Sequence, residues 1–140
     1  MAATLTDGQR ATLALLADAL IPGGEGMPSA TDAGVPSRWI DRALDSRPDL
    51  AATFAETLVA AGGDDPTAYL AQLETVDHPR LEAFQLLVVG AYFMSPRTRK
   101  VLGYPGQKQD PVTPGEADYY RPDELLADVR ARGTVYRAVD

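Results

Sequence analysis

The chain has 140 residues, which suits one compact domain and is too short for separate nucleotide-binding and substrate domains. Its 45% hydrophobic and 24% charged residues are typical of a globular protein rather than a disordered or fibrous one. Thirteen Lys and Arg against twenty Asp and Glu leave a formal charge of -7, with no concentrated basic stripe. A nucleic acid is therefore not an expected partner.

The chain contains no cysteine, which excludes disulfides, thiolate metal sites and cysteine nucleophiles. The first residues, Met1 to Asp7, have neither a basic region nor a continuous apolar region, so no signal peptide is expected here. The longest apolar stretch, Leu86 to Met94, is far shorter than the ~20 residues that a membrane-spanning helix needs. These features predict a cytoplasmic protein without a membrane span, which would be periplasmic only if a partner carried the export signal.

Apolar residues recur at helical spacing nearly everywhere, and prolines and glycines divide the pattern into segments. Thr6-Asp7-Gly8-Gln9 has the form of a capping box and predicts the start of the first helix. The glycine-rich stretch from Pro22 to Gly34 predicts an ordered loop. The expected helices run from Thr6 to Pro22, Pro36 to Arg47, Pro48 to Ala61, Pro66 to Val76, Pro79 to Met94, Pro96 to Leu102 and Pro122 to Gly133.

The predicted helix from Pro79 to Met94 is the longest, and we expect it to be the central one. Because Leu86, Val89 and Phe93 are apolar as well as the residues of its main face, this helix is expected to be buried on more than one side. No stretch alternates as a strand does. The prediction is an all-α fold, a compact orthogonal bundle of about six to seven helices. Residues 6–103 would form its core, and residues 104–140 an extended arm with a last helix.

No catalytic or cofactor motif is apparent. The only histidine, His78, precedes a proline and is expected to be a turn residue. Ser95 before Pro96 suits a helix N-cap, and no Gly-x-Ser-x-Gly elbow is present. Gly23-Gly24-Glu25-Gly26 follows no strand and lacks the lysine of a phosphate-binding loop. The sequence therefore predicts no catalytic, metal-binding or cofactor-binding residue in this chain.

Aromatic residues and prolines are concentrated in the second half. Tyr104, Tyr119, Tyr120 and Tyr136 fall in segments that a small helical core would not obviously cover. Tyrosine with proline in an ordered arm is a common way to build a protein contact. Either these rings form an interface, or the arm wraps its own helices and the rings fill gaps in the core. Trp39, at helical spacing with Val35, is expected in the core.

Five segments together resemble the gluconate 2-dehydrogenase subunit 3 family: Leu13 to Pro22, Met27 to Ala30, Ala33 to Val35, Tyr92 to Pro96 and Leu102 to Gly106. The resemblance covers residues 10 to 107 and is weaker in the tail. It implies a small, non-catalytic subunit that accompanies a large flavoprotein dehydrogenase of the glucose-methanol-choline type, which oxidises sugars, sugar acids or other alcohols. FAD would lie in that partner.

Two points depart from the family. Many of its members carry a twin-arginine export signal, which this chain does not show. Membrane-bound relatives pass electrons to a cytochrome subunit, and nothing in this chain is suited to holding haem. A further electron-acceptor subunit is left open.

The resulting hypothesis is that this chain binds and stabilises a large FAD-dependent subunit. The contact candidates are Met27, Pro28, Tyr104, Pro105, Tyr119 and Tyr120. One alternative is a stand-alone helical adaptor for another partner. The other is a small enzyme with a loop-based site that uses Asp32 or His78 as a base.

Overall fold

A computed structural model describes residues 5–109 and 127–133 of the chain. It divides into two compact units, residues 1–106 and residues 107–140. The described residues form helices and turns and no strand, apart from an isolated bridge between Gly24 and Met27. The prediction of an all-α fold is confirmed.

The first helix, α1, runs from Asp7 to Leu20 and begins with the predicted capping box. The Thr6 hydroxyl accepts from the Gln9 N–H at 3.2 Å, and Gln9 Oε1 accepts from the Thr6 N–H at 2.9 Å. Two of the amide groups that a helix start leaves without a partner are thereby satisfied. Leu13, Leu16 and Ala17 point into the core.

The loop between α1 and the next helical turn is folded by its own backbone. Gly24 and Met27 exchange two hydrogen bonds of 3.0 and 2.9 Å, and the Ala30 N–H donates to the Ile21 carbonyl. Asp18 in α1 accepts from the Thr31 N–H at 2.8 Å. Because its backbone groups are paired in this way, the loop is ordered, as predicted.

The second helical segment starts differently from the prediction. Pro36 lies in a π-helical turn, η1 (Val35–Trp39), and the regular helix α2 (Ile40–Ser46) follows. The helical segment as a whole matches the expected range. Trp39 is buried, as predicted, with the guanidinium groups of Arg38 and Arg42 over its ring at 4.8 and 5.7 Å from the centroid.

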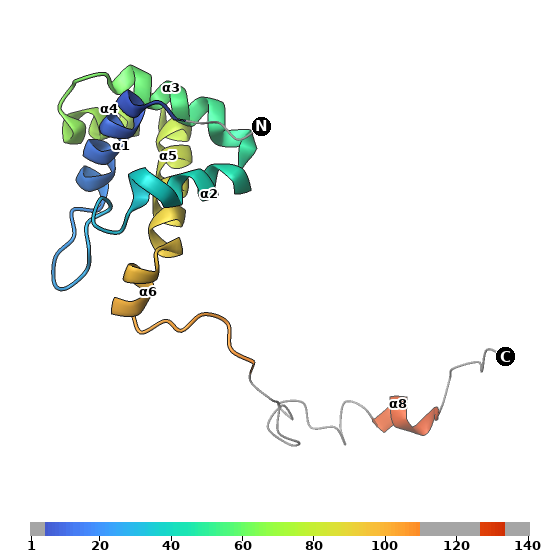
Figure 1. Cartoon of the computed structure of the whole chain (residues 1–140). Coiled ribbons are helices and arrows are strands. Elements are labelled where there is room, and N and C mark those ends of the chain that lie inside the picture. The colour runs from blue at the N-terminus through green and yellow to red at the C-terminus, as the bar shows by residue number, and fades with distance from the viewer. Residues whose placement is uncertain (1–4, 110–126, 134–140) are drawn as a thin grey trace. The chain divides into compact units, whose positions relative to one another are not determined.

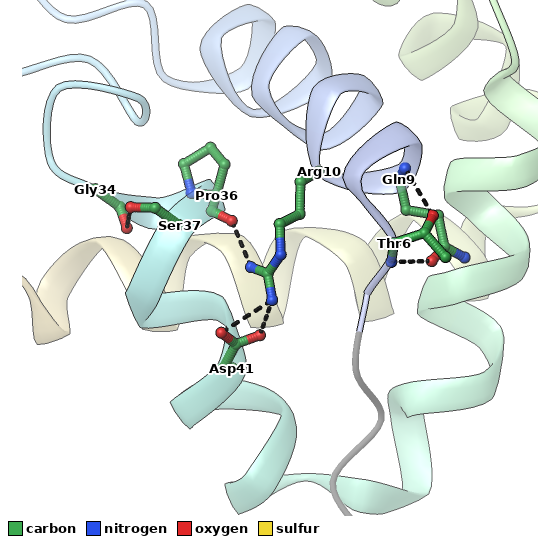
Figure 2. A network of polar contacts seen from close by, with 7 residues as sticks. All are labelled: Thr6, Gln9, Arg10, Gly34, Pro36, Ser37 and Asp41. Atoms are coloured by element: carbon green, nitrogen blue, oxygen red, sulfur yellow. Dashed lines mark hydrogen bonds and ion pairs between the residues drawn. The ribbon is translucent and has the colours of Figure 1, made fainter.

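Arg10 joins α1 to this second segment (Figure 2). Its Nη1 donates to the Pro36 carbonyl at 2.7 Å, and its Nη2 donates to both carboxylate oxygens of Asp41 at 2.8 and 3.1 Å. The carbonyl that Arg10 binds belongs to the π-helical turn. These charge-assisted bonds therefore fix where α1 lies against the start of α2.

The next two helices each pack against α1 and α5 (His78–Met94). A 3-10 turn, η2 (Pro48–Leu50), leads into α3 (Ala51–Ala61), and α4 (Pro66–Val76) follows with the predicted Asp65 N-cap, whose side chain accepts from the Ala68 N–H at 2.7 Å. Val76 at the end of α4 is apolar but 73% exposed. It is the last residue of the helix, and the buried residues of α4 are Tyr69 and Leu73.

Helix α5 (His78–Met94) is the central helix, as predicted. It packs against α2, α3, α4, α6 and η1, and Figure 1 shows it running through the middle of the first unit and crossing α2. Phe84 stacks on Phe54 of α3, with ring centroids 5.5 Å apart. The Tyr92 hydroxyl donates to the buried carbonyl of Pro28 at 2.7 Å, which ties α5 to the loop after α1.

Helix α6 (Pro96–Val101) follows α5 after Ser95, the predicted N-cap residue. In the second unit, the described residues include helix α8 (Ala127–Ala131), which lies within the expected last helix. The remainder of that predicted helix and most of the predicted arm lie outside the described residues.

Substitution of Gly23 tests how closely the loop after α1 packs on itself. Gly23 and Gly26 have similar left-handed φ values of 77° and 87°, but an added Cβ at Gly23 would lie 2.7 Å from the Ser29 nitrogen, whereas at Gly26 it would meet nothing within 4 Å. Both alanine variants carry the left-handed penalty of about 1–2 kcal/mol. Gly23→Ala should lose about 1–3 kcal/mol more, the range typical of overpacking, in urea unfolding followed by circular dichroism. Equal losses would contradict the crowded geometry.

The hydrogen bond of Tyr92 gives a second prediction. Tyr92→Phe leaves the buried Pro28 carbonyl without its donor, which should lower the free energy of unfolding by about 1–2 kcal/mol. The control is Tyr104→Phe, because the Tyr104 side chain is 54% exposed and water replaces its contacts. A Tyr92 variant as stable as the control would show that the bond contributes nothing.

Candidate protein-interaction site

The two candidate catalytic bases do not lie in a catalytic arrangement. His78 is half exposed at the start of α5, with Nδ1 3.7 Å from Glu74 and Nε2 3.5 Å from Glu82, both exposed carboxylates. Asp32 is exposed, and its backbone carbonyl accepts from Arg97 Nη1 at 3.0 Å. Neither residue is among those that line the three cavities found within residues 5–109, whereas a loop-based active site requires convergent groups in a pocket.

The shifted pKa values have structural causes. Burial raises the pKa of Tyr69, whose hydroxyl donates to the Thr57 carbonyl at 3.3 Å. The hydrogen bonds between Arg47 and Asp49 raise the pKa of the guanidinium and lower that of the carboxyl. A packed tyrosine and an exposed ion pair account for these shifts, so they do not indicate a catalytic group.

Two kinds of feature are absent from residues 5–109 and 127–133. Within these ranges, no group of three His, Asp or Glu side chains is arranged to hold a metal ion. No helix there has the length and apolarity to cross a membrane.

Of the six predicted contact residues, two lie in the loop after α1. Met27 is half-buried against the core. Pro28 is buried, and its carbonyl is the acceptor for Tyr92. The Pro28 side chain is therefore unavailable to a partner while the loop keeps this fold, and the role of Pro28 in this structure is to hold α5.

Two other predicted contacts, Tyr104 and Pro105, are exposed beside the end of α6. The Gly103 N–H donates to the Lys100 carbonyl at 3.2 Å, and the Tyr104 N–H donates to the Arg99 carbonyl at 2.9 Å. With Gly103 at a left-handed φ of 66°, this is the Schellman pattern of a helix C-terminus. The backbone of Tyr104 is thus held by the helix end.

The exposed apolar side chains at this end form what we name the α6-end cluster: Val101, Leu102 and Tyr104. Their exposed fractions are 48%, 51% and 54%. The other two predicted contacts, Tyr119 and Tyr120, lie outside the described residues.

A second apolar surface was missed because its residues were expected in the core. Leu86, Val89 and Phe93 of α5 are 52%, 36% and 50% exposed, so the prediction that α5 is buried on more than one side is wrong. We name these three residues the α5 stripe. They recur at three- and four-residue steps and so share one face of the helix. An open groove lined by Glu82, Gln85, Leu86, Val89 and Gly90 runs along this face.

The buried face of α5 explains why the stripe is free. Leu87, Val88 and Ala91 are at most 2% exposed and fill the core, so the opposite face is turned outward. The signal that could have indicated exposure is the number of apolar residues on α5, which exceeds what one buried face needs. A helix with apolar residues around its circumference needs neighbours on all sides, and the predicted number of helices was small.

Comparisons with known proteins do not assign the chain to a family. No family model, no curated protein and no solved structure matches it.

The two faces of α5 are distinguished by substituting neighbouring leucines. Leu87→Ala should cost about 2–5 kcal/mol of unfolding free energy, because it leaves a cavity in the core, whereas Leu86→Ala should cost less than about 1 kcal/mol. Thermal and urea unfolding of the two variants measure the difference. Similar losses at both positions would mean that Leu86 is covered.

Proposed function

We propose that this chain is a non-catalytic small subunit that binds and stabilises a large FAD-dependent dehydrogenase of the glucose-methanol-choline type, which oxidises CH–OH groups of sugars or related alcohols. The single observation that supports a binding role is the α6-end cluster, an exposed apolar surface held by a structured helix end. The choice of a flavoprotein as partner rests on the sequence resemblance, in which Leu102-Gly103-Tyr104-Pro105-Gly106 is one of the five segments. FAD belongs to the partner.

The composition of the α6-end cluster suits an interface. Tyrosine is enriched at the centres of protein contacts, and the buried core of an interface is more apolar than the rest of a protein surface. The Schellman turn orders the Tyr104 backbone before binding, so less conformational entropy is lost when a partner covers the ring. Arg97 and Lys100 on the same short helix are exposed and favour a partner with acidic residues around its own apolar patch.

The proposed effect on the partner is thermodynamic. A subunit that binds only the folded partner raises its stability in proportion to RT ln(1 + [L]/Kd), which is about 2.7 kcal/mol at a hundredfold excess over Kd. It would also cover apolar surface that the large subunit otherwise exposes, and so aid assembly. In this proposal the large subunit selects the substrate, and the location of the complex is cytoplasmic unless that partner carries an export signal.

Each of the two alternative functions, the helical adaptor and the small enzyme, has a specific test. A helical adaptor would use the same apolar surface on a partner that holds no flavin. A small enzyme would show activity of the purified chain that Asp32→Asn or His78→Gln abolishes.

The proposal is tested by co-expressing the chain with a candidate large flavoprotein and following flavin absorbance in size-exclusion chromatography, with sugar-dependent dye reduction as the activity. We expect a yellow complex whose solubility or activity depends on this chain. Leu102→Ser combined with Tyr104→Ser should weaken binding at least about tenfold, because two interface side chains are lost.

The matched control is Val76→Ser, which removes an apolar side chain that is 73% exposed at the end of α4. It should leave binding unchanged. A fully active flavoprotein that never co-elutes with this chain would contradict the proposed function. Equal effects of the control and the double variant would contradict the assignment to the α6-end cluster.

A further inference from the structure

Two arginines of the first unit lie on the Trp39 ring without a carboxylate partner. The guanidinium carbons of Arg38 and Arg42 are 4.8 and 5.7 Å from the centroid of the indole. Both residues are exposed, and neither guanidinium forms an ion pair or donates to an oxygen in the described part of the chain. The arginines of residues 5–109 that do form ion pairs are Arg10, Arg47 and Arg80. The two arginines on Trp39 therefore have unused donors.

The spacing of these two arginines brings their charges together. Arg38 and Arg42 are four residues apart, and such residues are neighbours on a helical surface, with about 5–6 Å between their Cβ atoms. A guanidinium carries five N–H donors in a planar fork that fits a carboxylate. Because both side chains already contact the ring, less side-chain entropy is lost when an anion binds them.

The indole of Trp39 supplies a further donor. Trp39 is only 9% exposed, yet its Nε1–H donates to no acceptor among the described residues. A buried indole N–H usually has a hydrogen-bond partner. The Nε1 edge lies beside Gly34, where an added Cβ would be 3.5 Å from Nε1 and 3.7 Å from Ser37 Oγ. Since Gly34 has no side chain, this position does not cover the N–H.

We propose that Arg38, Arg42 and the Trp39 indole N–H form a site that binds carboxylates of an acidic segment in a partner protein. All three groups donate hydrogen bonds and two carry positive charge, so the site takes an anion with acceptor oxygens. Two acidic residues one helical turn apart on the partner match the spacing of the arginines. Arginine and tryptophan are also enriched among the residues that dominate binding energy at protein contacts.

The surroundings favour a polypeptide over other anions. A nucleic acid or an anionic membrane presents negative charge over a large area, which the formal charge of -7 repels. A short acidic segment responds mainly to charges within a Debye length, about 8 Å at physiological salt. A free small anion would not be enclosed, because none of the three cavities is lined by Arg38, Trp39 or Arg42. A polypeptide adds contacts on either side of its carboxylates.

The test uses Trp39 as the reporter, because it is the only tryptophan of the chain. The probe is a capped, helical peptide with glutamates one turn apart, and its control is the same peptide with glutamines. With the full chain and no flavoprotein present, we expect the glutamate peptide to change Trp39 emission saturably. The dissociation constant should be on the order of 0.1 mM at low salt and should rise with added salt. The glutamine peptide should have no effect.

Variants locate the site. Arg38→Gln combined with Arg42→Gln should raise the dissociation constant at least about tenfold, measured by the anisotropy of a labelled peptide so that the readout is independent of Trp39. The matched control, Arg47→Gln with Lys108→Gln, removes the same charge from exposed positions elsewhere and should leave binding unchanged. Circular dichroism checks folding. If the glutamine variant fails to fold, Arg38→Lys with Arg42→Lys keeps the charge but loses the fork, and should still weaken binding several-fold.

The opposite results overturn the proposal. A peptide that does not bind at several mM, or that binds without changing Trp39 emission, shows that the site does not take an acidic segment. Equal losses in the arginine variant and the charge control would show only a general attraction. Free glutarate that binds as tightly as the peptide would make the occupant a small dicarboxylate. The inference goes beyond the proposed function, because its residues differ from the α6-end cluster and failure of flavoprotein binding leaves it intact.

Discussion

The packing of α5 organises the first unit. Its buried face, with Phe84, Leu87, Val88 and Ala91, supplies the surface on which α2, α3, α4 and η1 lie. The Tyr92 hydroxyl extends this role to the loop after α1 by holding the Pro28 carbonyl. Because α5 is a helix of 17 residues with apolar side chains around its circumference, covering it completely requires neighbours on every side. The described residues supply them on one side only.

The proposed binding role rests on the α6-end cluster, whose apolar side chains are exposed as well. The described polar groups serve mainly the fold: Thr6 and Asp65 cap helices, Asp18 holds the loop, and Arg10 joins α1 to α2. Most of the exposed large apolar side chains, by contrast, lie in the α5 stripe and the α6-end cluster, whereas Leu15, Val59 and Val76 are exposed elsewhere. Exposed apolar surfaces of this kind are typical of protein-interaction sites.

Helix ends were predictable because their signals are local. Thr6, Asp65 and Ser95 lie at the helix starts that their sequence context indicates, and Gly103 occupies the left-handed position that ends α6. The π-helical turn at Val35–Trp39 was not predicted, and part of what holds it is the bond from Arg10 to the Pro36 carbonyl, 26 residues away in the sequence. Of the candidate contact residues, Tyr104 and Pro105 are exposed, whereas Pro28 is buried and its carbonyl accepts a hydrogen bond from Tyr92, 64 residues away.

The sequence by itself determined the all-α class, the order of the helices and the positions of their caps. Those properties depend on hydrogen bonds and backbone preferences within a few residues. Only the tertiary structure decided which apolar residues are covered. Leu86 and Leu87 are adjacent and chemically identical, yet one is 52% exposed and the other 2%. Burial depends on which distant elements reach a helix face, and on this side of α5 the described chain places none.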